Sequence, residues 1–273
     1  MRRYRACSNL ALPQLSVREF YTGRTILITG ASSGIGRAMA ERLAPMGARL
    51  ILVARREAEL NALASSLRSE TAVFAHDLEP PGAARDLAGL VRERGFGVDV
   101  LVGNAGFGYA GPFLDHADDA VGMVDLNVRA LTELTGAFLP AMVERGRGGV
   151  LNVASLAGFS TTPNFAVYGA TKAYVLRFTE ALHDELRGSG VHATALCPGP
   201  VATNFGGRSG LKDSYFDLGV PVEAVAHAGL AGLAKNKARV VPGLLTKIGA
   251  FSTRLVPGGL ARRIGRAIVD AGR

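Results

Sequence analysis

The sequence predicts an α/β fold in which a doubly wound parallel sheet forms a single domain. Six strand-like apolar segments, separated by helix-length stretches, are the first observation: 25–29, 49–54, 71–75, 98–102, 150–154 and 191–196. The second is the glycine-rich stretch TGASSGIG at 29–36, directly after the first strand. The third is that no repeat or Pro/Gly/Ser linker divides the chain into two cores. Alternation of this kind implies right-handed crossovers and a parallel sheet with helices on both faces.

The first strand and its turn predict a dinucleotide site. Residues 25–29 (TILIT) are β-branched and apolar, as expected for a strand that is buried on both faces. Gly30, Gly34 and Gly36 follow, and a side chain at such positions would keep the backbone away from a bound ligand. The next helix presents free N–H groups and the positive end of its dipole, which favour phosphate.

The whole chain is expected to consist of one domain with a segment at each end. Residues 1–23 are expected to form an N-terminal arm, 24–242 the catalytic domain with a short final strand at 239–242, and 243–273 a basic amphipathic extension. The segment 204–219 (NFGGRSGLKDSYFDLG) is expected to be a flexible loop. Because ligands of doubly wound sheets lie beyond the carboxyl ends of the strands, this loop either closes over a substrate or is an ordinary surface loop.

The end of the second strand predicts a preference for NADP(H) over NAD(H). An NAD site usually has an acidic residue here for the ribose hydroxyls, whereas a basic residue accommodates the 2′-phosphate of NADP. No Asp or Glu occurs between positions 50 and 56, and Arg55 and Arg56 follow the strand. Arg55 comes first and is the stronger candidate, while Arg56 assists or stacks on adenine. The alternative is that both arginines are simply solvated.

Tyr168 and Lys172 form a pair suited to proton transfer. Four residues apart on a helix, they share one face and are separated by about 6 Å along its axis. A tyrosine with a pKa near ~10 is a poor proton shuttle at neutral pH, but a nearby ammonium favours the phenolate and lowers that pKa. Such a tyrosine can protonate a carbonyl oxygen or deprotonate an alcohol.

With these motifs in place, the chain resembles the short-chain dehydrogenase/reductase family over roughly residues 24–205. The resemblance rests on TGASSGIG, Asp77, NAG at 104–106, Asn127, Ser155, YGATK at 168–172 and PGPVAT at 198–203. It implies a Rossmann-type domain and an oxidoreductase that transfers hydride between a nicotinamide and a carbonyl or secondary alcohol. The family commonly has NNAG where this chain has Gly103 before Asn104, a departure expected to loosen local hydrogen bonding.

The resemblance also implies individual roles. Tyr168 would be the general acid/base, Ser155 would bond the substrate oxygen, Lys172 would also hold the nicotinamide ribose, and Asn127 would anchor a water that relays protons to Lys172. Asp77 would receive the adenine amino group, with Leu78 beside it. The other implied coenzyme contacts are Gly30, Ser32, Ser33, Gly34, Ile35 and Gly36 in the turn, Asn104, Ala105 and Gly106 near the adenosine ribose, and Pro198, Val201 and Thr203 near the nicotinamide.

The expected substrate is a small molecule with a lipophilic carbonyl or alcohol, of acyl, steroid-like or xenobiotic type. Aromatic residues suited to lining an apolar pocket are Phe107, Tyr109, Phe159, Phe165, Phe205 and Phe216. Family members are often dimers or tetramers, so a homodimer or homotetramer is expected.

The charge distribution argues against nucleic acid as a partner. The formal net charge is +8, but residues 25–234 carry 17 basic and 21 acidic side chains. The excess therefore lies at the two ends, and not along a binding groove. Residues 243–273 are expected to pack on the core or a partner subunit, with weak contact to an anionic membrane surface as the alternative. The first residues make a poor signal peptide, which leaves a cytoplasmic protein as the expectation.

Two other functions are alternatives for this chain. A hydrolase is disfavoured because Ser155 lies in VASLA and not in a G-x-S-x-G nucleophile elbow. A non-catalytic NADP-binding regulator of the same fold remains as the alternative, although such a protein has no need for the complete Tyr–Lys–Ser–Asn set. No metal is expected, because neither the histidines nor Cys7 and Cys197 have metal or redox spacing.

Overall fold

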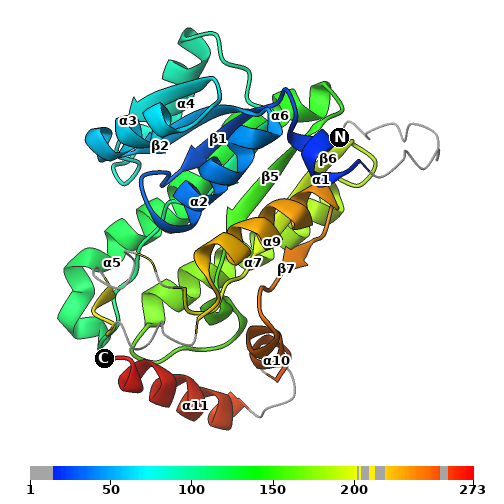
Figure 1. Ribbon diagram of the computed structural model, residues 1–273. Helices are drawn as coiled ribbons and strands as arrows, with labels where there is room; N and C mark the ends of the chain where they lie inside the picture. Colours follow the sequence, from blue (N-terminus) through cyan, green and yellow to red (C-terminus); the bar gives the residue numbers. More distant parts are fainter. Residues whose placement is uncertain (1–14, 202, 204–208, 213–218, 253–257) are drawn as a thin grey trace.

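The computed structural model describes residues 15–201, 203, 209–212, 219–252 and 258–273. Seven parallel strands form one sheet in the order β3-β2-β1-β4-β5-β6-β7 (Figure 1). The strands are β1 (Thr25–Thr29), β2 (Arg49–Ala54), β3 (Thr71–Ala75), β4 (Val100–Gly103), β5 (Gly148–Val153), β6 (Val191–Leu196) and β7 (Arg239–Val240). The predicted doubly wound parallel sheet is confirmed.

The helices cover both faces of this sheet. They are α1 (Val17–Tyr21), α2 (Gly34–Leu43), α3 (Glu57–Ser66), α4 (Ala83–Glu93), α5 (Ala117–Val124), α6 (Leu131–Glu144), α7 (Ala166–Glu185), α9 (Val222–Ala234), α10 (Leu244–Ser252) and α11 (Gly258–Ala271). One core cluster joins the sheet to α1, α2, α3 and α9, and a second joins it to α4, α6 and α7. No helix in the described part of the chain is long and apolar enough to span a bilayer.

Strict alternation along the central strands creates these two cores. In β1, Ile26 and Ile28 face the first cluster while Leu27 faces the second. Successive strand side chains point to opposite faces, so a strand between two helical layers must be apolar throughout. Ile26, Leu27 and Ile28 are all fully buried.

Three strands have boundaries that differ from the predicted ones. β4 begins at Val100 and not at residue 98, β5 begins at Gly148 and ends at Val153, and β7 is two residues long. The apolar pattern does not mark these ends, because β5 starts on two glycines and Asp99 belongs to a buried polar contact with the Thr25 backbone N–H.

The core also reaches into the segment expected to be an N-terminal arm. Ser16 caps α1 by accepting from the Glu19 N–H, and the Glu19 carboxylate accepts from the Ser16 N–H. Phe20 and Tyr21 are buried in the first core cluster, where the Tyr21 hydroxyl donates to the Leu230 carbonyl at 2.8 Å. The packed structure therefore begins at least as early as Val17.

The chain order places a crevice at the carboxyl edge of the sheet. From β1 the chain winds outward through β2 to β3, then returns to β4 on the other side of β1. The loops after β1 and β4 therefore diverge, which is where ligands of doubly wound sheets bind. In Figure 1, α11 runs along the bottom of the molecule, with α5 near the end that carries the C-terminus and α10 near its other end. Val269 of α11 and Met123 of α5 share a buried cluster there.

Candidate active site

A cavity of about 640 Å³ opens at this carboxyl edge. The segments that line it are those that follow β1 to β6, together with α7, α10 and α11. The predicted site residues on its wall are Gly30, Ser32, Ser33, Gly34, Ile35, Arg55, Arg56, Asp77, Leu78, Asn104, Ala105, Gly106, Ser155, Tyr168, Lys172, Pro198, Val201 and Thr203. Gly36 and Asn127 are not on the wall. One cavity thus gathers residues that lie far apart in the sequence.

The three glycines of the turn have different neighbours. Gly30 and Gly34 have φ of +67° and +56°, which favour glycine. A Cβ on Gly30 would lie 2.8 Å from Asn104 Nδ2, and one on Gly36 would lie 2.6 Å from the same atom. These two glycines therefore make room for Asn104, and only Gly34 and Gly30 border the cavity. Gly36 lies against Asn104 and not on the cavity wall, and its expected contact with a ligand stays a prediction.

Asn104 joins the exits of β1 and β4. Its Nδ2 donates to the carbonyl oxygens of Thr29 at 2.8 Å and Gly30 at 3.2 Å. The Thr29 hydroxyl in turn accepts from the backbone N–H groups of Asn104 and Ala105, each at 3.0 Å. The glycine turn is thus held in place by the neighbouring strand before any ligand binds.

Gly103 lies against the side chain of Asn152 on the neighbouring strand β5. A Cβ at position 103 would lie 2.5 Å from Oδ1 of Asn152, its register partner on β5. The fully buried Asn152 side chain donates to the Thr179 hydroxyl at 3.0 Å, but its Oδ1 has no hydrogen-bond partner in the structure. Gly103 thus makes room for the Asn152 amide, and the loosening expected from the departure from NNAG stays a prediction.

The two arginines after β2 point to different parts of the wall. Arg56 Nη2 donates to the Ser32 and Ser33 hydroxyls at 2.9 and 3.0 Å, so it lies on the glycine turn. Arg55 Nη1 lies 4.0 Å from carboxylate oxygens of both Asp77 and Glu79. The sequence ranked Arg55 first, yet it is Arg56 that contacts the turn.

Lys172 is buried directly below Tyr168. Both lie on α7, and Lys172 Nζ is 5.8 Å from the centre of the Tyr168 ring. Nζ donates to the Val153 carbonyl, at the end of β5, over 2.7 Å. Burial lowers the pKa of Lys172 to about 8, because an ammonium loses solvation in the interior.

The Tyr168 ring is fixed from two sides. It is 8% exposed and stacks on Phe165 with centroids 4.4 Å apart. Gly108 also lies against the ring, because a Cβ there would come within 2.5 Å of Tyr168 Cδ2. Position 108 therefore admits no side chain while the ring stays where it is, a requirement that sequence reasoning missed.

The side chains of Ser155 and Asn127 both form hydrogen bonds that hold neighbouring segments in place. The Ser155 Oγ accepts from the Ala157 N–H at 3.2 Å, which caps the short helical turn after β5 and leaves the hydroxyl hydrogen out of that bond. Asn127 is 1% exposed on the π-helical turn Asp125–Ala130. Its amide accepts from the Phe107 N–H and donates to the Phe107 carbonyl and the Thr171 hydroxyl, at 2.9–3.0 Å. The side chain thus braces the loop after β4, and its role in a water relay stays a prediction.

The other end of the cavity is apolar. Phe107 and Phe165 line it as expected, whereas Tyr109 stacks on His116 and Phe159 packs in a separate cluster, so neither is on the wall. Phe205 and Phe216 lie outside the described residues, as does most of 204–219. The wall residues that the sequence did not identify include Leu156, Leu211, Gly265 and Val269.

Helix α11 forms one wall of this apolar end. Val269 is buried in the same cluster as Phe107, Phe165 and Tyr168, and Asp270 accepts from Asn164 Nδ2 at 2.6 Å. The Lys212 N–H donates to the Gly272 carbonyl at 2.7 Å. The end of the expected extension 243–273 therefore packs on the core. A further contact of this segment with a partner subunit or a membrane stays a prediction.

The described residues hold no group of three or more His, Cys, Asp or Glu side chains that fits a metal. His183 and His192 instead bond the backbone carbonyls of Ala193 and Leu233. Cys197 is buried, and burial raises the pKa of its thiol to about 12, which keeps it neutral and a poor nucleophile.

The depressed pKa of Lys172 has a consequence for stability. Between pH 8 and its ordinary value of 10.5, the unfolded chain holds more protons at this residue than the folded one, so stability rises with pH. Relative to Lys172→Met, which has no such group, we expect the wild-type free energy of unfolding to increase by about 1 kcal/mol from pH 8 to 9. Urea titrations of both proteins at several pH values measure the free energy of unfolding. If it changed with pH by the same amount in the wild type and in Lys172→Met, the prediction would be contradicted.

The comparisons with known proteins agree with this architecture. The profile of the family described as "short chain dehydrogenase" matches residues 24–213. Sulfoacetaldehyde reductase 2 of Chromohalobacter salexigens is 38% identical over 211 residues, which cover 73% of this chain and 83% of the relative.

Two solved structures are similar over most of the chain. A short-chain dehydrogenase from Sphingobium yanoikuyae in complex with NADPH is 33% identical, with a TM-score of 0.77 over 85% of this chain and 93% of the other. A short-chain dehydrogenase/reductase from Burkholderia phymatum in complex with NAD is 26% identical, with a TM-score of 0.76 over 86% and 93%. The chain therefore belongs to the short-chain dehydrogenase family of oxidoreductases.

Proposed function

We propose that the protein is an NADP(H)-dependent oxidoreductase that interconverts a lipophilic carbonyl compound and its secondary alcohol, with Tyr168 as general acid/base. The observation that carries this proposal is that Tyr168, Lys172 and Ser155 border the same cavity as the glycine turn. In this arrangement a proton donor and a dinucleotide site are within reach of one substrate.

Proton transfer is the task of the protein side chains. The Lys172 ammonium favours the phenolate of Tyr168, so that the phenol can give its proton to a substrate oxygen. The Ser155 hydroxyl donates to the same oxygen and stabilises its developing charge. Hydride transfer is the chemistry that the nicotinamide supplies when bound. Thr203 and Val201 would hold that end of the coenzyme, and Lys172 its ribose.

The turn and its arginine fit the 2′-phosphate of NADP. Arg56 and the hydroxyls of Ser32 and Ser33 already form one cluster, and all three can donate to a phosphate. Arg56 also pairs with Glu59 at 3.5 Å, whereas Arg55 lies 4.0 Å from two carboxylates, those of Asp77 and Glu79, and does not contact the turn hydroxyls. We therefore assign the main phosphate contact to Arg56 and a secondary one to Arg55. One solved relative holds NADPH and another NAD, so the preference rests on these side chains.

The apolar end of the cavity supports a lipophilic substrate. Phe107, Phe165, Leu211 and Val269 form much of its wall. Among the described residues on the cavity wall, the only Lys or Arg side chains are Arg55, Arg56 and Lys172, all assigned to the coenzyme. A sulfonate such as that of sulfoacetaldehyde would lack a cationic partner there. An acyl, steroid-like or xenobiotic ketone fits this wall better.

Tyr168→Phe tests the proposal directly. The substitution removes the proton donor but keeps the ring between Phe165 and Gly108, so NADPH binding should be preserved while kcat falls by roughly 10²–10⁴-fold. Absorbance of the reduced nicotinamide, followed over a panel of ketones, measures turnover. If the wild type binds NADPH but turns over no ketone in the panel, that result would favour the alternative, a non-catalytic NADP-binding protein.

Arg56→Ala tests the coenzyme preference. Losing a charge-assisted contact to the 2′-phosphate should weaken NADPH binding about tenfold and leave NADH binding nearly unchanged. Arg55→Ala should have a smaller effect. Arg187→Ala is the matched control, because Arg187 also pairs with an acid three residues away but lies on an exposed helix end. Equal losses for NADPH and NADH would contradict the assignment.

Gly108→Ala tests whether the position of the Tyr168 ring matters. The added methyl collides with the ring and moves the phenol, so kcat should fall at least about tenfold even though no catalytic group is lost. Gly89→Ala in α4 is the control, because nothing lies within 4 Å of its Cβ position. Unchanged kcat in Gly108→Ala would mean that the ring position is not critical.

A further inference from the structure

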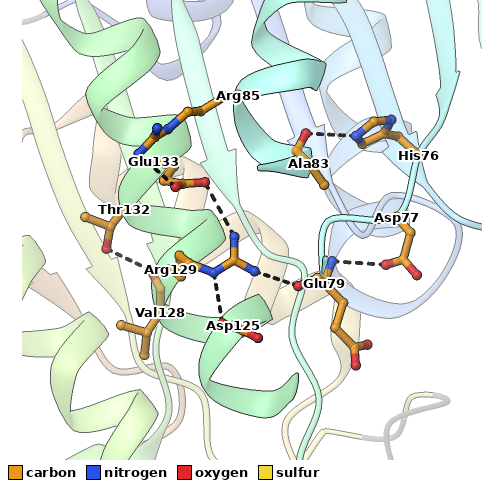
Figure 2. A network of polar contacts seen from close by, with 10 residues as sticks. All are labelled: His76, Asp77, Glu79, Ala83, Arg85, Asp125, Val128, Arg129, Thr132 and Glu133. Atoms are coloured by element: carbon orange, nitrogen blue, oxygen red, sulfur yellow. Dashed lines mark hydrogen bonds and ion pairs between the residues drawn. The ribbon is translucent and has the colours of Figure 1, made fainter. Parts of the chain in front are cut away.

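Arg129 is a charged side chain beside the site that the proposed chemistry does not use. It lies on the π-helical turn, two residues after Asn127, and extends toward the loop that leaves β3 (Figure 2). Its side chain is about three-quarters buried. A long cation this far removed from water needs a reason to be there.

The guanidinium joins three elements. Nη2 donates to the Glu79 carbonyl at 2.7 Å, and Nε donates to Asp125 Oδ1 at 2.8 Å. Nη1 lies 3.7 Å from Glu133 on α6, and Arg85 of α4 reaches the other oxygen of that carboxylate at 3.2 Å. Figure 2 shows Arg129 at the centre of this network. Its contact with the Glu79 carbonyl is the only one of these that crosses to the loop after β3.

That loop forms the adenosine end of the cavity. His76, Asp77 and Leu78 line the wall, and Asp77 is the residue expected to meet the adenine. The loop turns on itself where the Glu79 N–H donates to Asp77 Oδ1 at 3.1 Å. Fixing the Glu79 carbonyl therefore also fixes the carboxylate of Asp77 two residues earlier.

The other end of the contact is rigid. The π-helical turn is held by Asn127, whose amide bonds both backbone groups of Phe107 and the Thr171 hydroxyl. The loop after β3, in contrast, is a short connection at the rim of the cavity. If the Arg129–Glu79 bond is lost, the displacement falls on the loop and not on the turn.

We propose that Arg129 is a positioning residue for the coenzyme: it holds the loop His76–Glu79 against the π-helical turn, so that the adenosine half of NADP(H) meets a preformed site. The inference rests on the proposed function for the identity of the coenzyme. The competing interpretation is that Arg129 merely pairs the carboxylates of Asp125 and Glu133 and stabilises the helices.

The test uses the double variant Arg129→Met/Asp125→Asn, which removes the guanidinium without leaving Asp125 unpaired, while Glu133 keeps Arg85. Calorimetry should show about tenfold weaker binding of both NADPH and adenosine 2′,5′-bisphosphate. Reduced nicotinamide mononucleotide, which lacks the adenosine half, should bind as it does to the wild type. With a ketone substrate, KM for NADPH should rise by a similar factor, and kcat at saturation should stay within about twofold.

Two single variants complete the design. Arg85→Met is the matched control, since it removes an arginine from Glu133 but no contact with Glu79, and it should bind both adenosine ligands as the wild type does. Arg129→Lys keeps the charge but cannot reach Asp125 and Glu79 together, so it should bind them about threefold more weakly. If the double variant does not fold, the affinities of Arg129→Lys decide the test.

The outcomes separate the two interpretations. Wild-type affinity for adenosine 2′,5′-bisphosphate in the Arg129 variants overturns the inference, and so does an equal loss for the mononucleotide, which would indicate general loosening. Because binding is measured without substrate, a wild type that binds NADPH but reduces no carbonyl would refute the proposed function and leave this inference standing.

Discussion

The hydrogen bond from the buried Lys172 ammonium to the Val153 carbonyl is the contact on which the site depends. It ties α7 to the carboxyl end of β5 over 2.7 Å and thereby sets Tyr168, one turn earlier, at the cavity wall. Burial removes water from this charge and lowers the pKa of Lys172, which destabilises the charged form. A residue with a purely structural role would not need to carry a charge here. A methionine or leucine would fill the same space more cheaply. The fold thus maintains an ammonium where the proposed chemistry needs one.

Next to this contact, the segments that leave β1 and β4 pack closely through glycines and the side-chain amide of Asn104. Gly30 and Gly36 leave room for Asn104, whose side chain spans the two strand exits. Farther along the same loop, Gly106 and Gly108 lie against Asn127 and Tyr168. Each glycine allows a close approach that a methyl group would block. The loop after β4 therefore connects the glycine turn to α7 through close packing and through the hydrogen bonds of Asn104 and Asn127.

Much of this arrangement was predictable, because the sheet is encoded locally. The apolar strands and the glycine turn identify the parallel sheet, and the register of the fold then brings Ser155, Tyr168 and Lys172 to one edge. What could not be predicted depends on side-chain direction or distant contacts. Adjacent arginines point apart, so sequence order could not show that Arg56, and not Arg55, contacts the glycine turn. Val269 reaches the pocket only because α11 folds back across more than 100 residues of sequence, and its basic amphipathic pattern also left a membrane surface as the alternative.

The most direct measurement is a crystal structure of the protein with NADPH and an unreactive ketone or alcohol analogue. The account predicts that the ligand oxygen lies within hydrogen-bond distance of both the Tyr168 and Ser155 hydroxyls, with the nicotinamide above it and its ribose at Lys172. A complex in which the phenol points away from both ligands, or in which the dinucleotide lies outside the glycine turn, would contradict it.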